Sequence, residues 1–127
     1  MLFRSVIEGL TWRTTEAFFQ ARKFPNSPLY RAIHQLRTPR EAFQLAQDNR
    51  QSVRADWQKV SVDVMFEAVF CKFSQHPHLK KLLLSTGNRE LIEHTKNDSF
   101  WGDGGDGTGQ NQLGKVLMKV REILTQR

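Results

Sequence analysis

The chain has 127 residues and a mass of 14.8 kDa, which suffices for one domain with a hydrophobic core and is too little for two. Its net charge of +6 is spread without a run of five basic residues, which argues against a disordered nucleic-acid tail and weakly favours a phosphate-bearing ligand. Cys71 is the only cysteine, so a disulfide within the chain and a cysteine-based zinc site are excluded. The N-terminal residues contain no apolar segment long enough for a signal peptide or a membrane span. We therefore expect a cytoplasmic protein without a membrane partner.

Two short strands are expected within residues 2–12, joined by a turn at Glu8-Gly9. A helix capped by Thr14 or Thr15 follows and runs through Phe24. Capping signals and apolar periodicity predict further helices over 28–36, 39–48, 58–73, 78–85 and from Asn111 onward, with a strand at Leu91-Ile92-Glu93. The 58–73 helix is apolar around almost its full circumference, which is typical of a buried helix. The predicted fold is therefore α+β and mostly α, a compact single domain of helices around a buried central helix, with a small sheet near the termini.

One face of the first helix carries three polar groups of different chemistry. At 100° per residue, Glu16, Gln20 and Lys23 fall within about sixty degrees of one another. An acid, an amide and an amine on one face indicate the wall of a cleft. The alternative is an ordinary solvated face, which is the commoner setting for glutamate and lysine.

The segment 97–114, NDSFWGDGGDGTGQNQLG, contains six of the eight glycines together with three aspartates and a tryptophan. Glycines let backbone amides approach a ligand closely, so the segment predicts a binding loop. Asp98 and Trp101 open it with an acid and a flat apolar surface, which suit a site that holds a ring and stabilises positive charge. The alternative is a flexible surface loop.

Several other kinds of site are excluded by spacing. The glycines at 102–107 match G-x-G-x-x-G, but no acid follows about twenty residues later, as a dinucleotide fold requires. An EF-hand is excluded because no glutamate stands twelve residues from Asp98. His76, His78 and His94 lack a ligand spacing with carboxylates, so no metal or cofactor is expected.

Short motifs follow one another in a fixed order along nearly the whole chain. They are Thr15-Glu16, Phe18-Phe19-Gln20-Ala21, Lys23-Phe24, Arg54, Asp56-Trp57, Val64-Met65, Lys72-Phe73, Leu83, Thr86-Gly87, Leu91-Ile92-Glu93, Asp98, Trp101-Gly102, Gly109, Asn111, Leu113-Gly114, Leu117-Met118 and Arg121. Their order and spacing resemble the NADAR family, also called YbiA-like. The resemblance implies an α-rich fold with a small sheet and N-glycosidase activity on ribosides, namely riboflavin-pathway intermediates or ADP-ribosylated nucleobases.

Two departures from the family pattern bear on substrate range and activity. Ala17 stands where the family usually has a histidine directly after the glutamate. Residues 1–127 are expected to form a single NADAR domain that lacks the family's N-terminal segment with Ser-Asn-Phe.

Cleavage of a C–N riboside bond builds positive charge on C1′ and the ring oxygen, which a nearby carboxylate stabilises. The expected catalytic residues are Glu16 and Asp98 as carboxylates and Lys23 as an amine that attacks the ring-opened sugar. The expected substrate-binding residues are Gln20, Arg54, Trp57, Lys72, Trp101, Gly102, Asn111 and Arg121. Among these, Lys72 is the second candidate amine, the tryptophans are expected to stack on the base, and the arginines with the loop amides are expected to receive phosphate. We expect the helix face and the glycine loop to line the same hollow.

The expected partner is a small-molecule riboside or ADP-ribosyl substrate, with modified nucleic acid as a further possible substrate. A non-catalytic module that binds a nucleotide or ADP-ribose is the alternative function. A structural or nucleic-acid-contacting protein is a second alternative, which is favoured only by the net charge.

Overall fold

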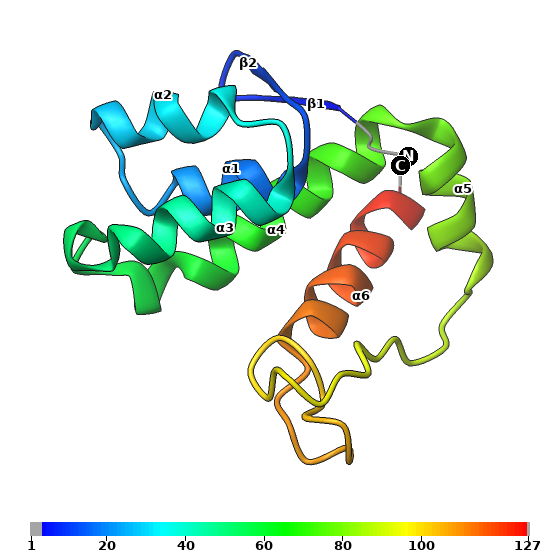
Figure 1. Ribbon diagram of the computed structural model, residues 1–127. Helices are drawn as coiled ribbons and strands as arrows, with labels where there is room; N and C mark the ends of the chain where they lie inside the picture. Colours follow the sequence, from blue (N-terminus) through cyan, green and yellow to red (C-terminus); the bar gives the residue numbers. More distant parts are fainter. Residues whose placement is uncertain (1–3, 127) are drawn as a thin grey trace. The chain divides into compact units, whose positions relative to one another are not determined.

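The computed structural model of the chain describes residues 4–126 (Figure 1). The chain forms two compact units, one up to Gln75 and one from His76 onward. The first unit contains β1 (Ser5–Ile7), β2 (Leu10–Trp12), α1 (Thr15–Ala21), α2 (Pro28–Gln35), α3 (Pro39–Asp48), a 3-10 turn η1 (Arg50–Ser52) and α4 (Trp57–Gln75). The second contains α5 (Pro77–Ser85) and α6 (Gln112–Thr125), joined by a long loop. The predicted α+β, mostly α class is confirmed.

The N-terminal hairpin forms as predicted within residues 5–12. Its strands are antiparallel, with Ser5 opposite Trp12 and Ile7 opposite Leu10. Glu8 and Gly9 both have positive φ, which the tightest two-residue hairpin turn requires. The side chain of Gln75 at the end of α4 donates to Val6 O and accepts from Val6 N, both at 2.7 Å, and so covers the free edge of β1. Residues 2 and 3 of the predicted strand lie outside the described residues.

The first helix, α1, begins where it was predicted to and ends earlier. Thr14 caps it by accepting a hydrogen bond from Ala17 N at 3.0 Å. The prediction that it runs through Phe24 is wrong, because α1 ends at Ala21. Lys23 N and Phe24 N instead bond to the carbonyls three residues earlier, and Pro25 then disfavours helical geometry at the residue before it.

Local capping chemistry positions α2 and α3 as predicted. Ser27 caps α2 ahead of Pro28, and Thr38 forms a complete capping box with Glu41 at the start of α3. Ile33 of α2 is fully buried, whereas Phe43 of α3 is 47% exposed. Two alanines of α3, Ala42 and Ala46, are buried instead, since the small side chains let the helix approach its neighbour closely.

In the first unit, α1 packs against α2, α3 and α4. Its residues Ala17–Ala21 are all buried, whereas most apolar residues of α4 are only half-buried. The most enclosed helix is therefore α1, which corrects the expectation that the 58–73 helix is buried all round. Aromatic packing reinforces this core, because the ring of the fully buried Trp12 meets Phe18 edge-on at 5.4 Å.

In the second unit, α6 is amphipathic as predicted and packs on α5. Val116, Val120 and Leu124 form its buried stripe. The strand predicted at Leu91-Ile92-Glu93 is wrong, since these residues form no strand. Their backbone is instead bonded by the side chain of Asn111, as described below. None of the helices over residues 4–126 is long and apolar enough to cross a membrane.

Candidate active site

The carboxylate and the amide predicted on α1 are joined in the structure. Gln20 Nε2 donates to Glu16 Oε1 at 2.8 Å, one helical turn apart. Glu16 is half-buried, whereas Gln20 is only 3% exposed although it is polar. The buried amide therefore holds the glutamate carboxylate in a fixed orientation.

The other end of the Gln20 amide is unusual for a buried group. An ionised carboxylate only accepts hydrogen bonds, so the amide NH₂ must face Glu16 and the carbonyl oxygen must face away. That oxygen, Gln20 Oε1, is buried and has no hydrogen-bond partner among the described residues. Because a buried acceptor without a donor costs free energy, the amide is suited to bind a donor from a substrate.

Lys23 completes this cluster from the turn that follows α1. Its Nζ lies 5.9 Å from the centre of the Phe19 ring and 5.7 Å from that of Trp57, and the two rings meet edge-on at 5.0 Å. Burial lowers the pKa of Lys23 below its ordinary value, and the negative charge of Glu16 offsets part of this effect. The lysine therefore yields a neutral amine more readily than a solvated one does.

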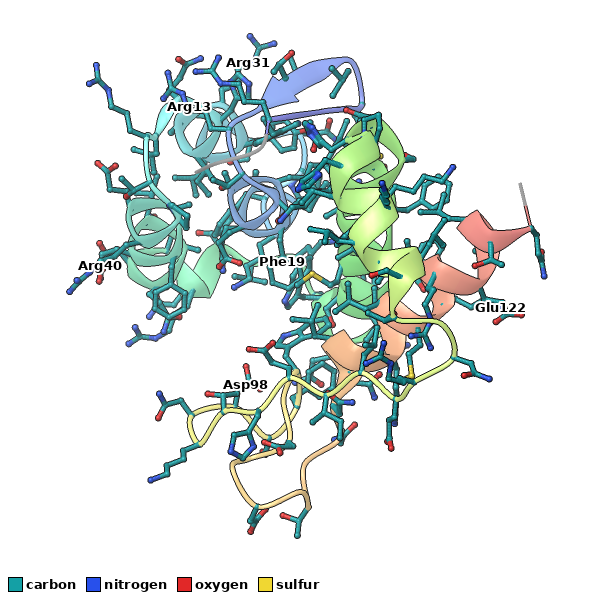
Figure 2. All side chains as sticks on the ribbon, turned by 90° about the vertical axis from the view of Figure 1, so that its right-hand side faces the viewer. Arg13, Phe19, Arg31, Arg40, Asp98 and Glu122 are labelled. Atoms are coloured by element: carbon teal, nitrogen blue, oxygen red, sulfur yellow. The ribbon has the colours of Figure 1, made fainter. Side chains whose placement is uncertain are left out.

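Figure 2 shows where Phe19, one of the two rings beside Lys23, lies in the first unit. Phe19 lies inside the unit, whereas Arg31 and Arg40 point outward from it. The ring of Phe19 is 5% exposed, so it serves as a fixed wall for the lysine.

Arg54 reaches the same cluster through its backbone. Its N–H donates to Lys23 O at 2.9 Å, and its C=O accepts from Trp57 N at 3.2 Å. Its guanidinium holds Asp56 with two hydrogen bonds of 2.6 and 3.0 Å, which lower the pKa of that carboxyl group. A phosphate group at Arg54 would therefore compete with Asp56.

In the second unit, Asp98 organises the start of the glycine-rich loop (Figure 2). Its Oδ1 accepts hydrogen bonds from Phe100 N at 2.9 Å and Trp101 N at 2.8 Å. The half-buried Trp101 ring meets Phe100 edge-on at 5.0 Å. The acid and the tryptophan thus belong to one ordered turn.

Gly102 and Asn111 close this loop. Gly102 is buried, and a Cβ there would meet Thr95 Cγ2 at 2.5 Å and Glu93 O at 2.8 Å, so only glycine fits without a shift. Gly102 O accepts from Asn111 N at 2.9 Å. The Asn111 side chain donates to Leu91 O at 2.9 Å and accepts from Glu93 N at 2.8 Å. Both residues therefore hold the loop together, and a role in substrate binding stays a prediction for each.

Arg121 and Lys72 are the two remaining candidates from the sequence. Arg121 lies on α6, is only 7% exposed and donates from Nη1 to Thr86 Oγ1 at 2.8 Å. This places its guanidinium in the packing between α5 and α6. Lys72 is half-buried in the last turn of α4.

The sequence matches the NADAR domain family over residues 3–125. The chain belongs to this family. The NADAR chain is 42% identical over 118 residues to N-glycosidase YbiA of Escherichia coli (strain K12), covering 93% of this chain and 74% of that protein. It is also 42% identical over 118 residues to riboflavin biosynthesis protein VVA0006 of Vibrio vulnificus (strain YJ016), covering 93% of this chain and 32% of that protein.

The solved NMR structure of the E. coli protein YbiA matches this NADAR chain with a TM-score of 0.90 and 40% identity, over 98% of this chain and 74% of that chain. Both the resemblance and the α-rich fold expected from the sequence are thereby confirmed. Its relationship to proteins named N-glycosidases makes the chain an enzyme, a hydrolase of N-glycosyl compounds.

One further pair in the loop of this NADAR chain was not predicted from the sequence. His94 Nδ1 lies 2.8 Å from Asp103 Oδ2, with the histidine side chain 73% exposed and the aspartate side chain 9% exposed. The two residues are nine apart in a loop of irregular backbone, where no periodicity relates their positions. Only the folded loop reveals the pair.

Within residues 4–126, no group of three or more His, Cys, Asp and Glu side chains is placed to hold a metal ion. The first unit also has an open cleft of about 990 Å³ between the hairpin and α2, lined by groups that include Glu8, Arg22, Tyr30 and Arg31. None of the predicted site residues lines this cleft.

Proposed function

We propose that this NADAR enzyme hydrolyses the C–N bond between a base or amine and a ribose or phosphoribose. Its substrates in this proposal are riboflavin-pathway intermediates or ADP-ribosylated nucleobases. The proposal treats residues 1–127 as one NADAR domain. The observation that carries it is the cluster in which Gln20 orients the Glu16 carboxylate beside the half-buried amine of Lys23.

Glu16 has the chemistry to stabilise the positive charge that develops on C1′ and the ring oxygen as the bond breaks. Because Gln20 fixes its orientation, the carboxylate needs little reorganisation during the reaction. We assign Asp98 the role of a second carboxylate that acts on the sugar. One oxygen of Asp98 is committed to backbone N–H groups, and the proposed contact uses the other.

Lys23 supplies a second route to the same products. Its lowered pKa favours the neutral amine, which can attack C1′ of the ring-opened sugar and form an imine that water then hydrolyses. Lys72 is the second candidate for this role. It ranks below Lys23 because it lies in the last turn of α4.

The substrate-binding residues supply stacking and phosphate contacts in this proposal. Trp57 and Trp101 are half-buried rings of the kind that stack on a base, while Arg54 and the loop amides near Gly102 receive phosphate. Riboflavin-pathway ribosides are the favoured substrates, because a 42% identical relative is named a riboflavin biosynthesis protein. The buried guanidinium of Arg121 is a weaker candidate for phosphate than Arg54.

The alternative function is a non-catalytic module that binds a nucleotide or ADP-ribose. The observation that favours it is Ala17, which is buried beside Glu16 where the family usually has a histidine.

The test incubates the protein with phosphorylated aminopyrimidine ribosides and, separately, with ADP-ribosylated guanine oligonucleotides, and measures the released base. Glu16→Gln should lower kcat by about 10²-fold or more while leaving the circular dichroism spectrum unchanged. Asp98→Asn should also lower kcat. Glu122→Gln is the matched control, because this glutamate is exposed on α6 and should leave kcat unchanged.

Release that both Glu16→Gln and Asp98→Asn leave intact would contradict the assignment of the carboxylates. Binding of a riboside without any release would favour the binding module. Borohydride trapping of a protein–sugar adduct that disappears in Lys23→Ala would support the imine route.

A further inference from the structure

The pair formed by His94 and Asp103 has the geometry of an oriented proton donor. The Asp103 carboxylate is held in place because its Oδ1 accepts hydrogen bonds from Thr95 N at 3.1 Å and Gly105 N at 2.8 Å. Its Oδ2 lies 2.8 Å from His94 Nδ1. All these partners belong to the second unit, so the pair is defined within that unit.

The backbone of Asp103 is also held by hydrogen bonds. Its N–H donates to Glu93 O at 2.9 Å, and its C=O accepts from Gly109 N at 2.8 Å. The carboxylate therefore has neither rotational freedom nor much access to water, since its side chain is 9% exposed.

This arrangement determines the protonation state of each ring nitrogen of His94. A carboxylate only accepts, so Nδ1 must carry the hydrogen that it donates to Asp103. The other nitrogen, Nε2, lies on the opposite edge of a ring that is 73% exposed. A buried carboxylate that orients an accessible imidazole through Nδ1 is the arrangement by which histidine transfers protons in hydrolases.

Asp103 is the charged group that acts on this imidazole through space. Its hydrogen bond and its charge raise the pKa of His94 above the ordinary value. The chain neighbours Glu93 and Lys96 carry opposite charges and are both exposed. A larger share of the histidine is therefore protonated near neutral pH than in a solvated residue.

We propose that His94 is the general acid of the N-glycosidase reaction and that Asp103 is its positioning residue. This inference rests on the proposed function. As the C1′–N bond breaks, its electron pair leaves with the nitrogen, which takes the proton from His94 Nε2. Water forms the new C1′–O bond and gives its surplus proton to solvent. Neutral His94 then takes up a proton from solvent, which restores the starting state.

The test compares three variants with the wild type on a phosphorylated aminopyrimidine riboside across pH. His94→Asn keeps an N–H donor near the position of Nδ1, and so preserves the bond to Asp103, but it removes Nε2. It should lower kcat by about 10²-fold or more, with KM little changed, and it should abolish the basic limb of the pH profile. His78→Asn is the control, because His78 is an exposed histidine on α5, and it should behave as the wild type.

Asp103→Asn tests the positioning role. The carboxamide oxygen of the new asparagine can still accept hydrogen bonds from the two backbone N–H groups. Its NH₂ group donates to Nδ1 of His94, so the hydrogen of the neutral imidazole moves to Nε2. The basic limb of the pH profile should shift to lower pH. Nitrogen NMR of the imidazole should show the Nδ1–H tautomer in the wild type and the Nε2–H tautomer in the variant.

Two results would overturn the inference while leaving the proposed function intact. One is a kcat for His94→Asn that stays within a fewfold of the wild-type value. The other is a His94→Asn variant that loses activity but keeps the basic limb of the pH profile. A wild type that releases no base from any riboside would refute the proposed function as well.

Discussion

Replacement of Gly114 by alanine sets two effects of opposite sign against each other. Gly114 lies in the first turn of α6, where helix propensity alone favours alanine by about 1 kcal/mol. In the folded unit, however, a Cβ at this position would overlap with Leu91 O and with both polar atoms of the Asn111 carboxamide. The steric effect should dominate.

The magnitude follows from the contacts that must move. The Asn111 carboxamide makes two hydrogen bonds, to Leu91 O and from Glu93 N, and each contributes about 1 kcal/mol. Forcing an extra methyl group into a packed site costs about 1 to 3 kcal/mol more. After the propensity gain is subtracted, Gly114→Ala should destabilise the fold by about 2 to 4 kcal/mol.

Urea unfolding followed by circular dichroism measures this free energy, and hydrogen exchange at Glu93 N–H reports the lost bond directly. Lys115→Ala is the matched control, because Lys115 is exposed on the next position of α6 and should change the free energy by less than about 0.5 kcal/mol. A Gly114→Ala protein as stable as the wild type, with unchanged protection at Glu93, would refute the steric argument.

Three further predictions follow from the first unit. Thr38→Ala should destabilise the fold by about 1 kcal/mol in urea unfolding without changing kcat, because it removes the capping box with Glu41, whereas Thr38→Ser should restore most of the loss. Gln20→Met should lower kcat about tenfold or more by releasing the Glu16 carboxylate, and an unchanged kcat would show that the amide does not orient it. Because burial lowers the pKa of Lys23 in the folded state, the unfolded chain binds more protons there, so stability should rise as pH increases from the lowered pKa to the ordinary one. Lys23→Met should remove that rise between neutral pH and about pH 10, and a slope identical to that of the wild type would contradict the assigned burial.

The parts of the fold that were predicted correctly depend on neighbouring residues. The turn at Glu8-Gly9, the cap at Ser27 and the capping box of Thr38 with Glu41 each involve groups no more than three residues apart. The same holds for Glu16 and Gln20, since a helix brings residues four apart into contact whatever surrounds it.

The wrong predictions concern residues whose environment comes from distant segments. Leu91-Ile92-Glu93 has the composition of a strand, but the side chain of Asn111 bonds its backbone from about twenty residues away. The 58–73 helix reads as apolar on all sides, yet its actual burial depends on how much surface its neighbours cover. Sequence periodicity shows which residues of a helix are apolar, but it does not show how many neighbouring elements pack against them.

Taken alone, the sequence determined the α-rich class, most helix starts, the family resemblance and the helix face that carries Glu16 and Gln20. These depend on local backbone geometry and on the order of residue types, which the chain carries whether or not it is folded. Only the tertiary structure decided that Lys23 lies over the rings of Phe19 and Trp57.

The tertiary structure also decided that Arg121 is buried and that Asp103 orients His94. Each of these facts depends on groups brought together from separate positions in the chain. The raised pKa of His94 also exists only after the chain has folded, because its hydrogen bond to Asp103 is a property of the packed molecule.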